Sequence, residues 1–227
     1  MNWLTRMRVD SRAAHQEKIY DSYAWHKKIW ECFPDCPTRQ RDFLTRIDHI
    51  EDAFCVWLLS NKRPVCPEWC LQENFSSKKI SPSFLSHQYY AFDLKVNPIK
   101  AVVQYDEKGN PLRDANGKRK RGKRIPLADQ DELRTWLARK GSIRCQDQSG
   151  HNISGGFRIV DDMPLEIRPM QEYHFRKKGQ SAYHGAVQFR GTLEVTDKEY
   201  FIKTYQQGIG SAKGFGFGLL LLAPVNL

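Results

Sequence analysis

The order of strands and helices expected from hydrophobic periodicity repeats between the two halves of this 227-residue chain. The first half reads as a strand, a helix that Pro34 ends, and two strands rich in β-branched and aromatic residues. These elements are expected at residues 1–10, 22–33, 41–50 and 53–60. Residues 64–83 are rich in Pro, Cys and Ser and show weak periodicity, so the close of the first half is poorly defined.

The second half reads as strand, helix, strand, strand, helix and strand. These elements are expected at residues 88–103 with a break at a proline, 126–141, 155–169, 185–196, 197–205 and 217–225. The repeat predicts an α+β fold made of tandem ferredoxin-like domains, the RRM-like βαββαβ unit with an antiparallel sheet. We expect one domain over residues 1–84 and the other over 85–227, and the first copy lacks an obvious second helix.

Composition limits the class of partner. The chain has 40% hydrophobic residues, as globular proteins do, and a net charge of +10. Such a surface favours polyanions, and no segment is both amphipathic and lysine-rich enough for membrane binding, so nucleic acid is the expected partner. No stretch is apolar enough to cross a bilayer, and Arg6 and Arg8 interrupt the apolar core that a signal peptide needs. We therefore expect a cytoplasmic protein with no membrane contact.

Six cysteines include two Cys-x3-Cys pairs, Cys32/Cys36 and Cys66/Cys70. Such pairs raise the question of a zinc site. Zinc knuckles use shorter turns that contain glycine, whereas these pairs are flanked by prolines and a tryptophan. We therefore favour reduced, scattered thiols and expect no metal and no cofactor.

The segment QQGIGSAKGFGFGLLLLAPV, residues 206–225, places five glycines and a lysine before an apolar strand. Glycine leaves backbone N–H groups uncovered, and such concavities accept phosphate oxygens. The spacing fits neither a Walker A loop nor a Rossmann fingerprint. Two interpretations remain open here: a phosphate-binding loop, or glycines selected only for tight packing between helix and strand.

Tyr23 and His26 lie three residues apart on the first expected helix and so share one face. A histidine that titrates near neutral pH can donate or accept a proton, and a neighbouring tyrosine can orient a hydroxyl group. The alternative is a structural histidine on a partly buried helix.

Both segments resemble the CasE family, the CRISPR repeat endoribonucleases of type I-E systems within the RAMP superfamily. The first motif is Y-x-x-H, then W-x-x-F-P and R-D-F-L, found here over residues 23–44. The second is G-I-G-x-A-K-x-x-G-x-G-L-L-x-L-A-P, found over residues 208–224. NPIKAVV and KRIPLADQDELRTWLARK also look like family segments, whereas the similarity is weakest over residues 61–87 and 141–182.

The resemblance implies metal-independent cleavage of precursor CRISPR RNA at the repeat hairpin, by an enzyme that stays bound to its product as a subunit of the Cascade complex. It places His26 and Tyr23 at the family's catalytic positions. RNA supplies its own nucleophile, the 2′-hydroxyl, so the protein must hold the in-line geometry, move a proton and stabilise charge. The expected products carry a 2′,3′-cyclic phosphate and a 5′-hydroxyl. Whether His26 acts as acid, base or both stays open.

The expected RNA contacts fall in two places besides the catalytic helix, to which we add Lys27. One is the glycine-rich loop, with contacts expected at Lys213, Gly208, Gly210, Gly214 and Gly216. The other is the segment HFRKKGQSAYHG, which should form a hairpin tip carrying Arg176, Lys177 and Lys178; the resemblance implies that this hairpin enters the groove of an RNA stem. The basic run at residues 116–124 is either a further RNA contact or a solvated loop.

Two other functions compete with this hypothesis. A catalytically silent RAMP subunit would only bind the RNA hairpin, but the presence of both Tyr23 and His26 argues against it. A general tandem-RRM protein would need aromatic residues in an RNP pattern, which VQFRGTLEV does not supply. The recognised repeat, the turnover behaviour and the Cascade subunits in contact are not specified by the sequence.

Overall fold

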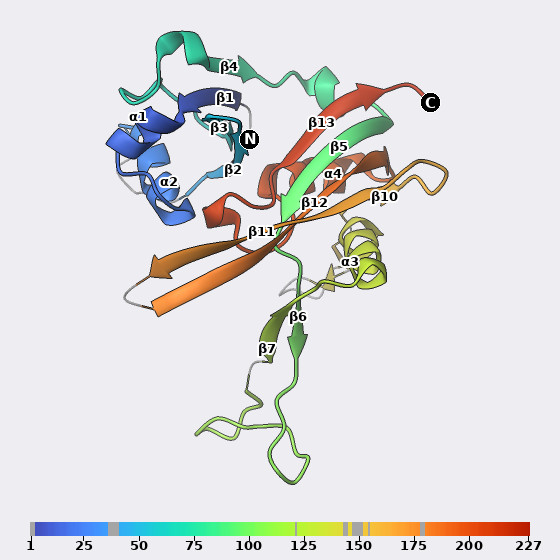
Figure 1. Ribbon diagram of the computed structural model, residues 1–227. Coiled ribbons are helices and arrows are strands. Elements are labelled where there is room, and N and C mark those ends of the chain that lie inside the picture. Colours follow the sequence, from blue (N-terminus) through green and yellow to red (C-terminus); the bar gives the residue numbers. More distant parts are fainter. Residues whose placement is uncertain are drawn as a thin grey trace.

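The computed structural model describes residues 3–35, 41–120, 122–142, 145–146, 152–153, 155–177 and 180–227. Two antiparallel sheets lie beside each other, and helices cover one face of each (Figure 1). A long two-stranded arm projects from the second sheet, away from the first.

The first sheet has the strand order β2-β3-β1-β4, with antiparallel pairing throughout. Its strands are β1 (Trp3–Asp10), β2 (Phe43–Ile50), β3 (Ala53–Ser60) and β4 (Phe75–Lys79). Its helical segments are α1 (Ser11–Gln16), α2 (Ser22–Ile29), η1 (Trp30–Cys32) and η2 (Gln72–Asn74). Because β1 and β3 lie in the centre and pair with each other, the sheet has the order of a ferredoxin-like unit.

Side-chain alternation explains why β1 forms at the centre of this sheet. Thr5, Met7 and Val9 are buried on one face, whereas the intervening Arg6 and Arg8 are exposed on the other. Helix α2 packs its own buried face against the apolar one, and the two surfaces form a single hydrophobic core.

The first half departs from the sequence expectation in two places. The short helix α1 follows β1 directly, in a stretch where the sequence predicted neither helix nor strand; Asp10 caps it by accepting a hydrogen bond from the Arg12 N–H at 2.7 Å. The edge strand β4 lies inside the segment of weak periodicity, because its sequence FSSKK buries little. Residues 61–74, all described, contain no α-helix, so the second helix of this unit is replaced by a loop.

The second sheet has the order β10-β12-β5-β13, with β11 pairing along the remainder of β12. Its strands are β5 (Tyr89–Val96), β10 (Phe157–Ile159), β11 (Glu166–Lys177), β12 (Gln180–Val195) and β13 (Leu220–Val225), and its helices are α3 (Gln130–Ser142) and α4 (Lys198–Gln207). This is again a ferredoxin-like unit. The predicted tandem ferredoxin-like fold is confirmed.

In the second half, the break expected at a proline within residues 88–103 is observed, whereas the strand expected at 155–169 is divided, contrary to expectation. The strand expected at 88–103 breaks at Asn97–Pro98, where proline prevents regular pairing, and its continuation β6 (Ile99–Val102) leaves the sheet to pair with β7 (Lys123–Pro126). The strand expected at 155–169 divides into β10 and β11, which pair with different parts of β12. The remaining short elements are η3 (Pro82–Leu85), η4 (Lys213–Phe215), β8 (Cys145–Gln146) and β9 (Asn152–Ile153).

A cluster of charged side chains joins the two sheets. Arg46 of β2 is 3% exposed, and its guanidinium contacts Asp48 at 2.7 Å and Asp93 of β5 at 2.6 Å. The Lys95 ammonium of β5 donates to the backbone oxygen of Ile47 at 2.6 Å. Because these bonds cross between the sheets, they restrict the angle at which the two units meet.

We propose that the domains divide near residue 84. Leu85 is buried and already belongs to the core of the second unit, together with Tyr90 and Phe92. Leu44 and Leu59 of the first sheet also pack into that core, so the two domains share apolar contact as well as the charged cluster. Among the described residues, no helix is long and apolar enough to cross a bilayer.

Candidate active site

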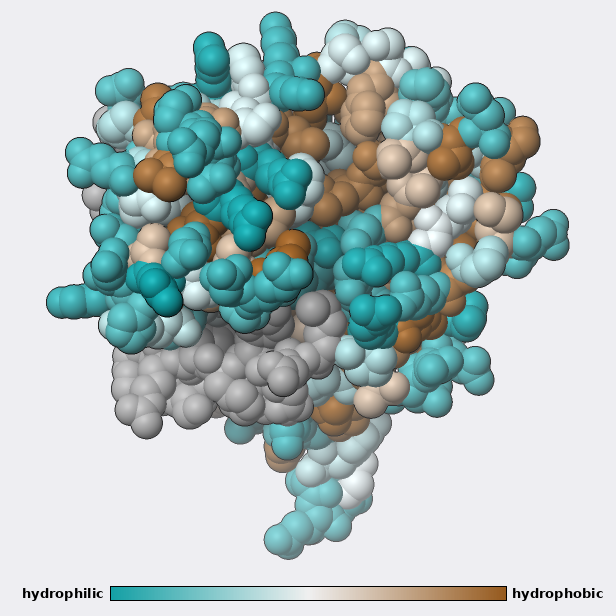
Figure 2. All heavy atoms as spheres, turned by 45° about the horizontal axis from the view of Figure 1, so that its top comes forward, coloured by the Kyte–Doolittle hydropathy of each residue, from teal (hydrophilic) through white to brown (hydrophobic). Residues whose placement is uncertain are grey.

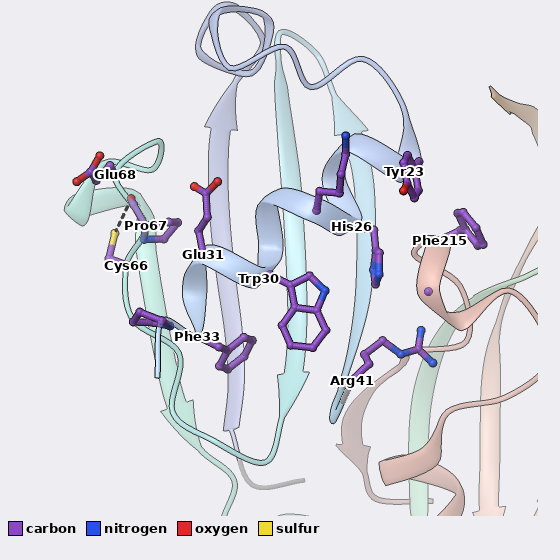
Figure 3. A pocket seen from close by; sticks show the side chains of 13 residues that line it. Tyr23, His26, Trp30, Glu31, Phe33, Arg41, Cys66, Pro67, Glu68 and Phe215 are labelled. Atoms are coloured by element: carbon purple, nitrogen blue, oxygen red, sulfur yellow. Dashed lines mark hydrogen bonds between the residues drawn. The ribbon is translucent and has the colours of Figure 1, made fainter. Parts of the chain in front are cut away.

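A cleft of about 1420 Å³ lies at the edge of the first domain, where α2 faces the glycine-rich loop of the second. Its lining includes Tyr23, His26, Trp30, Arg41, Glu68 and Phe215. Figure 3 shows His26 with Tyr23, Arg41 and Phe215 around it, whereas Glu68 lies at the opposite end. The cleft therefore combines residues from both domains.

The sequence of α2 explains how Tyr23 and His26 reach this cleft. Asp21 caps the helix, since its carboxylate accepts a hydrogen bond from the Ala24 N–H at 2.7 Å. Trp25 and Ile29 point into the core and fix the rotation of the helix. The opposite face then presents Tyr23 and His26 together, as their spacing of three residues predicted.

Aromatic rings surround the imidazole of His26. Its ring centroid lies 6.4 Å from those of Trp30 and Phe43, and the last two rings meet edge to face at 4.9 Å. Phe33 stacks on Phe43 at 5.3 Å and completes this apolar support. The packing holds the imidazole at the cleft wall, in a place suited to proton transfer to or from a bound ligand.

Lys27 follows His26 on the helix, and its side chain turns back over Tyr23. The Lys27 ammonium lies 5.0 Å from the centre of the Tyr23 ring, a cation–π arrangement between residues one helical turn apart. This contact places positive charge at the mouth of the cleft, beside the tyrosine.

The glycine-rich loop approaches the first domain closely at three of its glycines. A Cβ atom added at Gly208 would lie 2.8 Å from a Leu44 methyl group, and one at Gly216 would lie 3.4 Å from that of Ile47. An added Cβ at Gly214 would lie 3.0 Å from Nη1 of Arg41. Close packing thus accounts for Gly208, a φ of +88° favours glycine at the buried Gly216, and Gly214 lines the cleft.

Gly210 has a different neighbour, because an added Cβ there would lie 3.3 Å from the Trp136 ring of α3 within the same domain. Its φ of +85° also favours glycine. Contact with RNA at these four glycines therefore stays a prediction, and only Gly214 lines the cleft that holds His26.

Two cations meet at the boundary between the loop and β2. Burial lowers the pKa of Lys213, and the charges of Arg41 and Lys140 lower it further; burial likewise lowers the pKa of Arg41. Neither side chain forms an ion pair with a carboxylate in the part of the chain that the structure describes. Half-buried cations without a carboxylate partner are an unsatisfied positive site, which an anion such as phosphate would neutralise.

Arg41 was not among the candidate site residues predicted from the sequence, although it opens the R-D-F-L motif. Its motif position was the only available signal. Its partner Lys213 lies more than 170 residues further along the chain, so only the fold brings the two together.

The structure places Arg176 and Lys177 at the end of β11, paired in register with Ser181 and Gln180 of β12. Lys178 lies outside the described residues. The expected basic hairpin is thus formed mostly by extended strands, and β11 passes within contact distance of α2. RNA binding by these three residues stays a prediction.

Three of the cysteines gather beside η1, at the end of α2. The Val65 N–H donates to the Cys32 carbonyl oxygen at 3.0 Å, which brings the loop containing Cys66 and Cys70 against η1. Burial, followed by the proximity of the other two thiols, raises the pKa of Cys32 to about 12. The described residues contain no group of three His, Cys, Asp or Glu side chains placed to hold a metal ion, and Cys36 lies outside them.

Comparison with known proteins gives concordant results. A family described as "CRISPR associated protein" matches residues 2–224. The chain is 30% identical over 211 residues to the CRISPR system Cascade subunit CasE of Escherichia coli (strain K12), which covers 90% of this chain and 93% of that protein.

Two solved structures are similar along their whole length. The CRISPR-associated protein Cas6e from Escherichia coli str. K-12 has a TM-score of 0.68 and 26% identity, and the match covers 99% of this chain and 100% of that one. The CRISPR endoribonuclease Cse3 bound to 19 nt RNA has a TM-score of 0.66 and 25% identity, and the match covers 98% of this chain and 99% of that one.

Proposed function

Because this chain belongs to the family of CRISPR-associated proteins that includes CasE, we propose that it is an endoribonuclease which cleaves precursor CRISPR RNA at the repeat hairpin. The observation that carries the proposal is that Tyr23, His26 and Arg41 line one cleft, and that Arg41 also lines a smaller pocket together with Lys213. The two pockets together offer a proton carrier and two cations without a carboxylate partner, linked through Arg41, as transesterification of a phosphodiester requires.

The reaction begins with attack of the RNA 2′-hydroxyl on the adjacent phosphorus, in line with the leaving 5′ oxygen. His26 takes the proton from the 2′-hydroxyl or gives one to the leaving oxygen, and Tyr23 orients the reacting hydroxyl. The guanidinium of Arg41 and the ammonium of Lys213 stabilise the negative charge that grows on the phosphate oxygens. The products are a 2′,3′-cyclic phosphate and a 5′-hydroxyl, and no step requires a metal ion.

The surrounding surface supports binding of a folded RNA. Lys27 adds charge beside Tyr23, and the hairpin with Arg176, Lys177 and Lys178 begins next to α2. One relative is named as a Cascade subunit, and one similar structure is an endoribonuclease bound to RNA. Both names support a protein that stays on its mature guide RNA and contacts other Cascade subunits. Such an enzyme works in the cytoplasm, where the precursor is transcribed.

The test is incubation of the purified protein with repeat RNA from its own organism in the presence of EDTA. Cleavage at a single position of the repeat hairpin, with a 2′,3′-cyclic phosphate at the new end, is the expected result. Tight binding without cleavage would instead favour the catalytically silent RNA-binding subunit. A requirement for a divalent ion would contradict the proposed chemistry.

A further inference from the structure

A basic arm extends from the second domain between two strands that leave the sheet. We define it as residues 99–126, which comprise β6, β7 and the segment that connects them (Figure 1). None of the catalytic residues lies on it. The sequence alone leaves its run of basic residues as either an RNA contact or a solvated loop.

The arm contains the same turn twice, eight residues apart. In the first turn, the Asp106 carboxylate accepts hydrogen bonds from the N–H groups of Lys108 and Asn110 at 2.9 and 2.8 Å. In the second, the Asp114 carboxylate accepts from those of Asn116 and Lys118 at 2.9 and 3.0 Å. A glycine with positive φ occupies the same position in each, Gly109 at +81° and Gly117 at +75°.

Backbone hydrogen bonds connect the two turns into a three-segment antiparallel meander. The Leu112 N–H donates to the Gln104 oxygen, and the Lys120 N–H donates to the Leu112 oxygen, both at 2.8 Å. Arg113 also donates to the Gly117 oxygen at 2.7 Å. The arm is therefore a hydrogen-bonded structure with an ordered backbone, which reduces the backbone entropy lost on binding.

The arm concentrates the positive charge of the protein. It carries nine Lys and Arg residues against three Asp and Glu residues, which amounts to more than half of the net charge of +10. Lys100 pairs with Glu132 of α3, but the other described cations of the arm form no ion pair. One carboxylate oxygen each of Asp106 and Asp114 accepts the hydrogen bonds of its own turn. Figure 2 shows the arm projecting from the body with a largely hydrophilic surface.

The root of the arm lies against the β11–β12 hairpin. A Cβ atom added at Gly185 of β12 would lie 3.2 Å from the Cβ of Pro126, so β7 packs on the hairpin at that point. The same hairpin passes within contact distance of α2 through β11. In Figure 1 the hairpin accordingly lies between α2 and the arm. An RNA stem that starts at His26 and follows the hairpin therefore leads toward the arm.

The chemistry of the arm fits a phosphate backbone better than a protein surface. Protein interfaces are depleted in lysine and place aromatic or apolar side chains at their centre. The arm instead presents Lys118, Arg119 and Lys120 consecutively, and its large exposed apolar side chains are only Val102, Tyr105 and Ile125 among the described residues. Clustered cations without an apolar centre are typical of sequence-independent contact with nucleic acid.

We propose that the basic arm is a second RNA-binding site, which holds the phosphate backbone of the RNA stem at the end far from the cut. The proposal rests on the proposed function, because it takes the repeat hairpin as the ligand. It predicts that the arm contributes affinity and salt dependence and carries no base specificity.

The experiment measures the affinity of catalytically active full-length protein for a 2′-deoxy-blocked repeat hairpin across a range of salt concentrations. The variant Lys118→Gln/Arg119→Gln/Lys120→Gln removes three cations from the arm and leaves both aspartate turns intact. Its slope of log affinity against log salt should be smaller by roughly two to three, at about 0.9 per phosphate contact. The wild type should bind a hairpin shortened from its loop end more weakly than the full hairpin. With that shortened RNA, the salt slope of the wild type should equal the slope of the variant.

The matched control is Arg12→Gln/Lys78→Gln/Lys79→Gln, which removes the same charge from exposed positions of the first domain. Its slope should equal that of the wild type. Equal slopes for the arm variant and this control would overturn the proposal, as would an arm variant that loses a protein partner while its RNA slope is unchanged. Cleavage of the unblocked hairpin by the wild type tests the proposed function separately, so failure of one proposal is distinguishable from failure of the other.

Discussion

Replacement of Lys213 by methionine should slow cleavage and stabilise the fold at the same time. The ammonium of Lys213 is half-buried beside Arg41, and no carboxylate among the described residues neutralises either cation. If Arg41 and Lys213 stabilise a bound phosphate, the repulsion between their charges destabilises the protein without RNA. Binding of the RNA phosphate removes that repulsion. Methionine keeps most of the side-chain volume and removes only the charge.

The magnitude follows from the geometry of the site. One preorganised donor in a closed active site contributes about 10²–10³ in rate. This cleft is open to solvent, which screens the charge, so we expect a loss of roughly 10- to 100-fold in the single-turnover rate. Arg41→Gln should have a similar effect, and the double variant should lose less than the product of the two, because both cations act on the same charge.

The stability of the same variant supplies an independent readout. A lysine whose pKa in the fold lies below its value in the unfolded chain releases its proton on folding between those two pH values. Stability therefore rises with pH across that interval in the wild type, and Lys213→Met should abolish this rise. At neutral pH the variant should be more stable by about 0.5–1 kcal/mol.

Urea unfolding and rapid-quench cleavage on the same preparation provide both measurements. Lys203→Met is the matched control, because Lys203 is exposed on α4 and pairs with Glu199 at 2.6 Å. The control should leave cleavage unchanged and should not stabilise. A Lys213→Met protein that cleaves at the wild-type rate, or that is less stable than the wild type, would refute the reasoning.

The remaining predictions concern proton transfer, the domain interface and the glycine-rich loop. His26→Ala should reduce the cleavage rate by about two to four orders of magnitude with little change in hairpin affinity, and a rate near that of the wild type would remove His26 from the active site. Burial alone would raise the pKa of Asp93, but hydrogen bonds from Arg46, Gln188 and Arg190 lower that pKa overall. Because protonation of Asp93 breaks these bonds, the domain interface should lose stability as pH falls below about 4. Asp93→Asn should cost roughly 2–3 kcal/mol at pH 7 and flatten that acid dependence in urea titrations, whereas an unchanged dependence would locate the titration elsewhere. Gly208→Ala should destabilise by about 1–3 kcal/mol, because φ is +74° and the new Cβ would lie 2.8 Å from the Gly218 carbonyl oxygen; a neutral effect would show that the loop relaxes.

The elements with strong periodicity were predictable from the sequence. The strand expected at residues 53–60 is β3, residue for residue, because Val56, Leu58 and Leu59 are buried in the centre of a sheet. The helix expected at 22–33 is α2 followed by one turn of 3-10 helix. In both cases the local pattern and the tertiary environment agree, which is why local reasoning suffices.

Elements held mainly by tertiary contact were not predictable. Strand β4 has a polar sequence and exists because Met7 and its neighbours in β1 offer an edge to pair with. The meander of the basic arm depends on two aspartate turns that lie eight residues apart. The amino-acid composition of this segment is that of a charged, solvated loop, so it does not predict the meander. Arg41 and Lys213 meet through the packing of one domain on the other, and no local pattern encodes that contact.

Resemblance to the CasE family supplied the proposed catalytic pair, and the structure shows its surroundings. Tyr23 and His26 would otherwise read as residues of a partly buried helix. The cleft, the aromatic support around His26 and the two unpaired cations give those residues a physical setting that neither spacing nor motif describes.

The most direct test of the central claim uses a repeat hairpin with a single 2′-deoxy nucleotide immediately upstream of the cut. Removal of that hydroxyl deletes the nucleophile and leaves the phosphates, the stem and the base sequence unchanged. In EDTA, the protein should bind this RNA with nearly the affinity of the all-ribose hairpin and should not cleave it. Cleavage of the deoxy substrate at the same position would show that water or another nucleophile attacks the phosphate, and would contradict the mechanism assigned to His26 and Tyr23.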